Sequence, residues 1–523
     1  MNIHKNKQKV IDGIVKVADA IAITLGASGK NVIIEEDLYP GFRITNDGYT
    51  ILENTHFDDP LMQMGRNILF DAVSRANRQS GDGSTTTTVL TKAIIENGLE
   101  ESMTGMELKD QLHAMLPHVL KMIDERKKVV EISELAPVVE ISAESGEIGK
   151  MVQEIYEKIG KEGLITIEPS STYETSYDIK DGVRLKSKTG ELVKYIQNTE
   201  KGVIYENPFV LVIRNRINDA SNLSDILSDL AAGEKWKGEV VIMIDDIDQK
   251  ALGTLVANHQ KAMGAIRGEA GRKYVKFGII RAPVLWKHQV MEDFAKITGA
   301  TIIDDAAGIT FKSARKECAG TADKIIIEED GTTVIGIKDV SEHVEQLRQR
   351  NDDVSPLRVA WLNTKACAIR VGAQSETELS YLLPKAEDAI NAARMALRDG
   401  VVAGGGVCLK DIAIELENYP VGNEATRILA KSLMAPFRQI CKNANMNPTD
   451  ETRKPNIGLN AKTKLEGDMW EEKILDPAGV LKNAISNAVS VASTALTAEV
   501  ILTKDRTEEE IARNFIRKQQ QQF

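Results

Sequence analysis

The feature that most constrains the fold is a change of pattern along the chain, which is helical at both ends and mixed in between. In the first quarter, apolar residues such as Ile14 and Ile21 recur at helical spacing. Between about 209 and 335, short apolar runs alternate with helical stretches, which is typical of βαβ units. From about 377 the pattern is helical again. We therefore expect a mainly α protein with an α/β insertion, whose helical domain is discontinuous and is built from both chain ends.

The same patterns predict individual elements. Strands are expected at 31–35, 209–213, 240–244 and 277–280, and a hairpin at 325–335 with its turn at Asp330-Gly331. Helices are expected at 61–80, 85–103, 107–127, 220–232, 249–263, 387–397, 424–444 and 478–497. Asp476 precedes Pro477, and this pair predicts an N-cap followed by the first residue of the last helix.

Length, charge and cysteine content exclude several classes of protein. The chain has 523 residues, enough for roughly two to four domains, and a net charge of −11 argues against binding along a nucleic-acid backbone. The four cysteines form no C-x-x-C pair, so zinc ribbons and thioredoxin-like chemistry are not expected. The polar N-terminal segment is unlike a signal peptide, and no apolar run reaches the roughly 18 residues of a membrane helix. We therefore expect reduced thiols and a cytoplasmic protein.

The segment Ser80-Gly-Asp-Gly-Ser-Thr-Thr-Thr-Thr-Val89 has the composition of a phosphate site. Two glycines flank Asp82, and a run of hydroxyl side chains opens the following helix. A helix N-terminus offers free N–H donors, glycines let the backbone approach an anion, and a carboxylate can hold Mg²⁺. A helix that is simply capped after a turn explains the same residues equally well, so this segment alone leaves both readings open.

Three further segments gain meaning only in combination. Thr24-Leu-Gly-Ala-Ser-Gly-Lys-Asn-Val32 lacks the spacing and the Ser or Thr of a Walker A motif, so we reject a P-loop. Asp399-Gly-Val-Val-Ala-Gly-Gly-Gly-Val407 has three consecutive glycines that let a ring or a phosphate approach, and Asp388 precedes it on the expected helix. The last segment is Ile474-Leu-Asp-Pro477. Alone, each is more typical of a turn, a helix cap or a solvated helix charge.

Together, these four segments have the order and the distances found in the bacterial group I (GroEL-like) chaperonins, which the sequence resembles over nearly its whole length. Supporting matches are Ile44-Thr-Asn-Asp-Gly48, Gly160-Lys-Glu-Gly-Leu-Ile-Thr-Ile167, Ala435-Pro-Phe-Arg-Gln-Ile440 and Gly458-Leu-Asn-Ala461. The resemblance implies a three-domain chaperonin that captures and folds non-native proteins at the expense of ATP. Its domains would be an equatorial ATPase domain at 1–126 and 399–523, a hinge-like intermediate domain at 127–182 and 366–398, and an apical substrate-binding domain at 183–365.

The resemblance also implies roles for single residues. Asp82 would hold Mg²⁺, and Asp388 would orient the attacking water with help from Asp47. The nucleotide would be ATP, with K⁺ as a further candidate cofactor. The nucleotide-binding residues would be Thr24, Leu25, Gly26, Ala27, Gly81, Asp82, Gly83, Ser84, Thr85, Thr86, Gly405, Asn460, Ala461 and Asp476.

The partners implied by the resemblance are unfolded client proteins and further copies of the same chain. Clients would bind apolar side chains of the apical domain, although Leu252 and Val256 also fit a plain helix core. These side chains are Val193, Tyr195, Ile196, Leu227, Leu252 and Val256. The copies would form a seven-membered ring, with a co-chaperonin lid as a further candidate partner. Neither nucleic acid nor a membrane is expected as a partner.

Several positions depart from the family pattern, which predicts a divergent member and leaves a viral source open. Asn46 stands where the family has a lysine, so one phosphate-facing charge is missing. The two ion pairs that commonly join back-to-back rings cannot form as usual, because Asn447 stands where the family has the glutamate partner of Arg438, and Glu100 replaces a lysine. We therefore expect single rings rather than stable double rings.

Two other functional classes are weighed against this one. A ring-forming holdase or scaffold with little ATP turnover would fit the same fold, but the intact Asp47, Asp82 and Asp388 argue against it. An unrelated metabolic enzyme is the second class, and no His, Cys or Ser triad pattern supports it.

Overall fold

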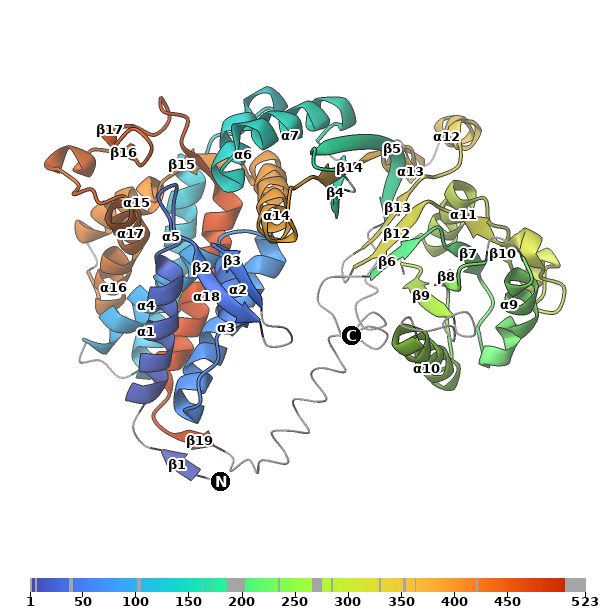
Figure 1. Cartoon of the computed structure of the whole chain (residues 1–523), viewed down its shortest axis with the longest axis horizontal. Coiled ribbons are helices and arrows are strands. Elements are labelled where there is room, and N and C mark those ends of the chain that lie inside the picture. The colour runs from blue at the N-terminus through green and yellow to red at the C-terminus, as the bar shows by residue number, and fades with distance from the viewer. Residues whose placement is uncertain are drawn as a thin grey trace. The chain divides into compact units, whose positions relative to one another are not determined.

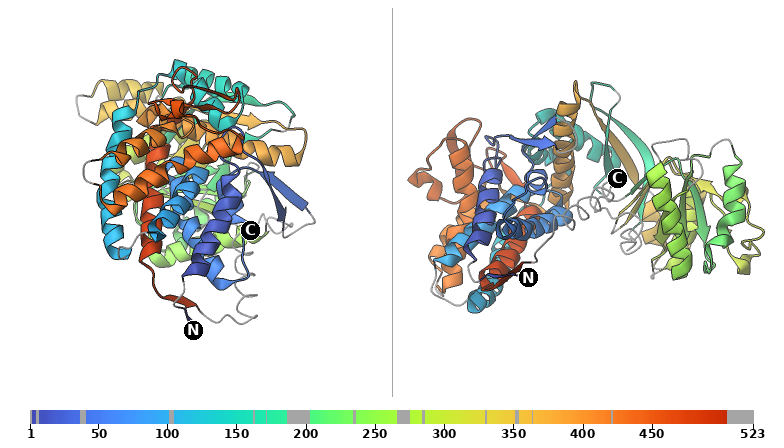
Figure 2. Two further views of the ribbon diagram at one scale, coloured as in Figure 1. Left: turned by 90° about the vertical axis from the view of Figure 1, so that its left-hand side faces the viewer. Right: turned by 60° about the horizontal axis from the view of Figure 1, so that its bottom comes forward.

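The protein is described by a computed structural model (Figures 1 and 2) in which the chain forms two compact units. The first unit lies within Met1–Lys161, Ile167–Ser176 and Ile369–Asp505, and the second lies within Glu162–Thr166 and Tyr177–Ala368. The described residues are 2–4, 7–36, 41–100, 105–161, 163–170, 172–185, 203–233, 236–265, 275–283, 286–328, 331–350, 354–362, 364–419 and 422–503. A discontinuous unit with an inserted second one agrees with the sequence pattern, whereas the finer division into three domains stays a prediction.

Long helices from both ends of the chain form the core of the first unit (Figure 1). They are α1 (Gln8–Ala22), α3 (Pro60–Ser80), α4 (Ser84–Leu99), α5 (Gly105–Arg126) and α18 (Ala478–Thr497). α18 contacts α3, α4 and α5, and α1 packs along α3. The buried face of α18 carries Ala484, Ala488 and Ala492, and such small side chains let neighbouring helices approach closely.

Further helices and four two-stranded antiparallel sheets complete the first unit. The helices are α2 (Gly48–Glu53), α6 (Ala136–Ala143), α7 (Gly146–Ile159), α14 (Glu376–Asp399), α15 (Val407–Glu417), α16 (Glu424–Leu433) and α17 (Ala435–Asn443). The sheets pair β1 (Asn2–His4) with β19 (Ile501–Thr503), β2 (Val32–Glu36) with β3 (Gly41–Thr45), β15 (Val401–Ala403) with β18 (Leu475–Pro477), and β16 (Ile457–Asn460) with β17 (Leu465–Asp468). Among the residues that the structure describes, no helix combines the length and the apolar character needed to cross a membrane.

Several expectations about helix boundaries are wrong, and the helix expected at 387–397, for example, is the longer α14. The helix expected at 424–444 is divided into α16 and α17, because Pro436 in the first turn of α17 lacks an N–H and would clash with a helical carbonyl four residues earlier. Asp476 is not the N-cap of α18, because the helix begins at Ala478, one residue later than expected, and its N-cap is Pro477. Asp476 instead lies on β18, which pairs with β15. The strand pairing therefore brings Asp476 opposite Val402.

The second unit is built on a parallel sheet in the order β10–β7–β8–β9, to which β11 adds an antiparallel strand beside β7. The strands are β7 (Phe209–Ile213), β8 (Glu239–Ile244), β9 (Lys276–Arg281), β10 (Ile302–Ile303) and β11 (Gly320–Thr321). The helices of this unit are α9 (Ser224–Ala231), α10 (Gln249–Ala265), α11 (Lys287–Thr298), α12 (Ser341–Arg348) and α13 (Ser355–Leu362). Residues 240–244 of β8 are all buried, as is typical of a parallel strand covered on both faces.

A second sheet of this unit contains the expected hairpin. Its antiparallel neighbours are, in order, β5 (Ser176–Leu185), β13 (Thr332–Ile335), β12 (Lys324–Ile327) and β6 (Val203–Glu206). The pairing of β12 with β13 confirms the hairpin, although part of its turn lies outside the described residues. The chain changes unit within β4 (Leu164–Pro169), β5 and β14 (Lys365–Val371).

Three helices of the second unit are joined by a buried ionic cluster. His343 on α12 and Arg358 on α13 both reach the Asp293 carboxylate on α11. Arg358 Nε donates to Asp293 Oδ2 at 2.8 Å, and His343 Nε2 lies 2.6 Å from Asp293 Oδ1. The Asp293 side chain has no exposed surface, so the two facing side chains take the place of water around its charge.

Candidate functional site

The glycine loop before α4 has the backbone of an anion site. Gly81 and Gly83 have φ of 65° and 85°, a conformation that other residues rarely adopt. Gly83 is the N-cap of α4 and has no side chain that could accept hydrogen bonds from the first turn. The backbone N–H groups of that turn therefore point outward from the helix end. Ser84, Thr85 and Thr86, predicted to contact phosphates, form that first turn. The loop therefore offers N–H and hydroxyl donors together.

Asp82 in this loop is half-buried and lies near a second predicted carboxylate, that of Asp47. The Gly83 N–H and the Ser142 hydroxyl of α6 donate hydrogen bonds to its carboxylate, the latter at 3.3 Å. Burial raises the pKa of Asp82, the charge of Asp47 adds to this rise, and the Gly83 hydrogen bond opposes it. The carboxylate is thus placed where it lacks full solvation, which is a typical setting for a cation ligand.

Asp388 approaches the same place from α14. Burial raises its pKa well above the ordinary value, and the charges of Asp82 and Asp47 raise it further. Asn391, one turn later on α14, donates from Nδ2 to the Gly81 carbonyl at 3.2 Å. A Cβ at Gly81 would lie 2.1 Å from that Nδ2 atom, so only glycine lets α14 approach this closely. The structure therefore brings the three predicted carboxylates together, although Asp388 is more than 300 residues from the other two in sequence.

Asp47 also has a structural task. As the N-cap of α2 it accepts hydrogen bonds from the Tyr49 and Thr50 N–H groups at 3.1 and 2.9 Å, and from the Thr50 hydroxyl at 2.6 Å. The Ser84 hydroxyl lies 3.4 Å from its Oδ1. These bonds hold the carboxylate in one orientation beside the start of α4.

Sequence reasoning missed a cation and a carboxylate at this site. Glu144, which follows α6 with φ of 54°, accepts from Asn46 Nδ2 at 3.0 Å and from Lys385 Nζ at 2.7 Å, both at its Oε1. The charge of Lys385 opposes the rise in the pKa values of Asp82 and Asp388. Lys385 lies one helical turn before Asp388, and that spacing is the only sequence signal that could have identified it. A lysine thus stands near the carboxylates even though position 46 is an asparagine.

The segment Thr24–Ala27 lies beside the first turn of α4. The Thr24 side chain is buried, its hydroxyl donates to the Ile21 carbonyl, and its Oγ1 lies 3.4 Å from Thr85 Oγ1. Gly26 has φ of 83°, and Asn443 Nδ2 donates to the Leu25 carbonyl at 2.9 Å. These bonds fix the turn after α1 next to the hydroxyl run.

The residues predicted to hold adenine and ribose lie on the neighbouring short sheets. Gly405 has φ of 64° in the turn before α15, and Asp476 lies on β18. Burial and the charge of Asp82 raise the pKa of Asp476 to about 6, while the Gly406 and Gly405 N–H groups oppose this. Asn460 ends β16, and the Ser28 hydroxyl reaches the Ala461 carbonyl at 3.5 Å. The four predicted nucleotide segments therefore converge within the first unit.

These residues fit Mg²⁺ only together with a nucleotide. Within the described part of the chain, no group of three or more His, Cys, Asp or Glu side chains could hold a metal ion by itself. Mg²⁺ is normally bound by one or two carboxylates together with phosphate oxygens and water. Asp82 and its neighbours supply the first kind of ligand, and the donors at the start of α4 suit the phosphates.

The predicted client-binding residues are only partly covered by the structure. Leu227 on α9 and Leu252 and Val256 on α10 are partly buried and pack against the same apolar cluster beside the parallel sheet. Val193, Tyr195 and Ile196 lie outside the described residues. The groove expected between these segments stays a prediction.

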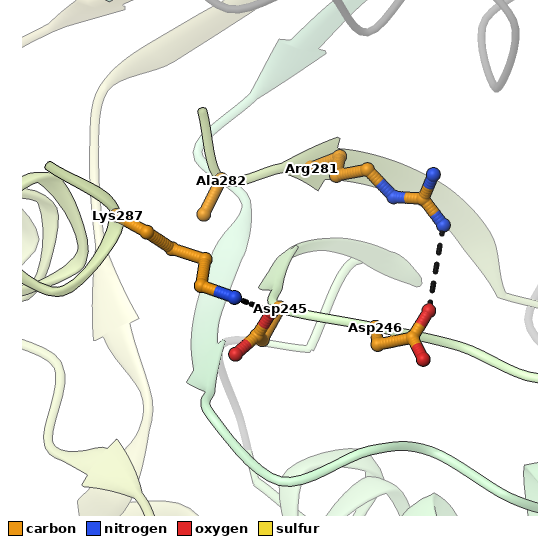
Figure 3. A pocket seen from close by; sticks show the side chains of 5 residues that line it. All are labelled: Asp245, Asp246, Arg281, Ala282 and Lys287. Atoms are coloured by element: carbon orange, nitrogen blue, oxygen red, sulfur yellow. Dashed lines mark hydrogen bonds and ion pairs between the residues drawn. The ribbon is translucent and has the colours of Figure 1, made fainter. Parts of the chain in front are cut away.

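One cavity of the second unit lies at the carboxyl ends of β8 and β9 (Figure 3). It measures about 390 Å³ and is lined by Asp245, Asp246, Arg281, Ala282 and Lys287. Its charges pair with each other, Lys287 with Asp245 at 2.5 Å and Arg281 with Asp246 at 3.6 Å. None of the predicted site residues lines this cavity.

Comparison with known proteins yields a family match and similar solved structures. Residues 17–506 match the model of the TCP-1/cpn60 chaperonin family. Two crystal forms of the chaperonin gp146 from the bacteriophage EL 2 (Pseudomonas aeruginosa), both in the presence of ATP-BeFx, have a similar fold. One has a TM-score of 0.67 at 17% identity and covers 96% of this chain and 98% of the other. The second has a TM-score of 0.64 at 16% identity and covers 97% and 100%. These findings confirm the predicted chaperonin fold.

Proposed function

Because the chain belongs to the TCP-1/cpn60 chaperonin family, we propose that it is an ATP-dependent chaperone that captures and folds non-native proteins within a homo-oligomeric ring. The observation that carries this proposal is the convergence of Asp47, Asp82 and Asp388 on the glycine loop that opens α4. The presence of ATP-BeFx in the gp146 crystals supports nucleotide binding.

The proposed roles follow from where each side chain lies. The N–H and hydroxyl donors of Ser84, Thr85 and Thr86 would bind phosphate oxygens at the positive end of α4. Bound Mg²⁺ would neutralise charge on the transferring phosphate, with Asp82 as its protein ligand and K⁺ as a further candidate. Asp388 would orient the attacking water, because its raised pKa suits a group that handles a proton.

The first test is ATP hydrolysis by the purified wild-type chain. We expect turnover of at least about 0.01 per second that requires Mg²⁺, since phosphoryl transfer depends on charge neutralisation. Phosphate release in the presence of Mg²⁺ or of EDTA measures this. ATP binding without turnover would favour the ring-forming holdase or scaffold. No ATP binding at all would contradict the proposed function.

Clients are expected to bind the apolar flank of α10. Leu252→Glu or Val256→Glu should reduce capture of a denatured client by at least about tenfold, because a buried charge replaces apolar contact. The ATPase rate without client should not change. Light scattering of a diluted, denatured protein measures capture.

Thr254→Glu is the matched control for this prediction. Thr254 is exposed on the same helix, and helical spacing places it on the other flank from Leu252 and Val256. It should retain capture. If Leu252→Glu and Val256→Glu both capture the denatured client as well as the wild type does, these side chains belong to the core of the second unit instead.

We propose single seven-membered rings, or double rings that split during the ATP cycle. Glu100, which replaces a lysine of the family, lies 3.4 Å from Lys431 of its own chain. Arg438 is exposed, but Asn447 offers it no charge. Native mass spectrometry should detect seven-subunit particles in at least one of the apo, ATP and ADP states. Fourteen-subunit particles alone in all three states would contradict this proposal.

A further inference from the structure

Lys410 has a buried side chain, which is unusual for a lysine. It lies in the first turns of α15, and its side chain is 1% exposed. Lysines of this kind are uncommon, because an ammonium loses its hydration on burial and needs replacement partners. No local pattern predicts this burial, since a helical lysine usually faces solvent. The contacts around the Lys410 ammonium show what replaces water.

Four oxygens surround the Lys410 ammonium. Nζ donates to the carbonyls of Thr452, Ile457 and Lys454 at 2.5, 2.7 and 3.1 Å. Asp411 Oδ1 lies 2.8 Å from the same Nζ and balances its charge. An ammonium has three N–H donors and no acceptor, so three inward-facing carbonyls and a carboxylate satisfy it. The Lys410 ammonium is therefore a cation that α15 holds among these oxygens.

The three carbonyls belong to one irregular segment, in which the Lys454 carbonyl also accepts a hydrogen bond from the Ile457 N–H. Residues 452–457 lead from a short 3₁₀ helix into β16, and Asn456 in this segment has φ of 62°. The Asn456 N–H donates to Asp411 Oδ2 at 2.8 Å. Lys410 and Asp411 together thus fasten this segment to α15, one through its carbonyls and the other through an N–H.

This attachment joins two parts of the candidate nucleotide site. α15 begins directly after the turn that contains Gly405, and β16 ends at Asn460, which Ala461 follows. Gly458 on β16 packs so closely that a Cβ there would lie 2.3 Å from Val407 Cγ2 on α15. The ionic attachment at 452–457 and this close packing set the position of β16 relative to α15.

We propose that Lys410 is a positioning residue of the nucleotide site. Its ammonium holds β16 against α15 and thereby fixes Asn460 and Ala461 opposite Gly405, on the side of the site assigned to adenine and ribose. The inference rests on the proposed ATP binding and adds to it a residue that touches no ligand. The phosphate side, formed by the loop at 81–83 and by α4, does not depend on Lys410.

The test compares binding of ATP with binding of inorganic tripolyphosphate, both with Mg²⁺, by calorimetry on the full chain. Lys410→Met alone leaves Asp411 as an unpaired buried charge, so the main variant is Lys410→Met with Asp411→Asn. We expect the Kd for ATP to rise about tenfold, as loss of a supporting group commonly weakens a site, and the Kd for tripolyphosphate to stay unchanged. Lys410→Arg, which keeps the charge and the donors, should retain more of the ATP affinity.

Lys442→Met is the matched control, because it removes an exposed ammonium from α17, which packs against α15. It should leave both affinities unchanged. Equal weakening of ATP and tripolyphosphate in the double variant would show a general structural role and overturn the inference. Unchanged ATP affinity would overturn it as well. If the wild type binds tripolyphosphate and ATP equally weakly or not at all, the proposed function itself fails.

Discussion

Asp388→Ala should retain ATP binding and hydrolyse ATP roughly 10²- to 10⁴-fold more slowly, the range by which a positioned acid or base accelerates a reaction. The variant removes the group proposed to orient water but leaves the loop at 81–83 and the start of α4 intact. Asp82→Ala should differ, because it removes the proposed metal ligand and should weaken nucleotide binding and turnover together. Single-turnover phosphate release and calorimetric titration with ATP measure the two quantities separately.

Glu387→Ala is the matched control for Asp388→Ala. Glu387 is the adjacent carboxylate on α14 and is exposed, so its loss should change turnover less than about threefold, as expected of a solvated charge. The assigned roles would be refuted if Asp388→Ala lost ATP binding to the same extent as Asp82→Ala.

Asp293→Ala should lower the free energy of unfolding of the second unit by about 3–5 kcal/mol, because it leaves Arg358 and His343 buried without their shared partner. Arg358 still has Glu292 at 3.0 Å, so its charge is only partly uncompensated. Urea unfolding of the full chain should show an earlier transition for the second unit. Hydrogen exchange of α11, α12 and α13 would identify that transition.

Glu345→Ala serves as the control for this stability prediction. Glu345 on α12 pairs with Arg348 at the surface, and exposed pairs contribute about 0–1 kcal/mol. An unfolding transition that is equally displaced in both variants would contradict the stated role of the buried cluster.

Local signals in the sequence predicted much of the helical unit correctly. The helix expected at 61–80 is found as α3, because Asp59 caps its start ahead of Pro60 and Gly81 ends it in the left-handed conformation. Such signals act over a few residues and are therefore readable without tertiary contacts. The N-cap predicted for Asp476 was wrong, because α18 begins one residue later and Asp476 lies on β18, which pairs with the distant β15.

Local sequence signals could not predict the contacts that hold the candidate site together. Glu144 and Lys385 are 241 residues apart, and Lys410 is 42 to 47 residues from its carbonyl partners. No periodicity distinguishes a lysine that is buried from one that faces water. The resemblance to a family identified the site residues. It marked Asn46 as a missing positive charge but did not identify Lys385 as a cation near the site.

Because Asp82, Asp388 and Asp476 lie close to one another, the proposed nucleotide cycle should depend on pH. Carboxyl groups with raised pKa values take up protons first as the surroundings acidify, whereas a cation held by Asp82 needs its ionised oxygens. Loading of Mg²⁺ with ATP would therefore release protons into the medium, and emptying of the site would take them up again. The nucleotide affinity of a chaperonin built in this way should weaken as the pH falls towards about 6, because burial and the charge of Asp82 raise the pKa of Asp476 to about 6.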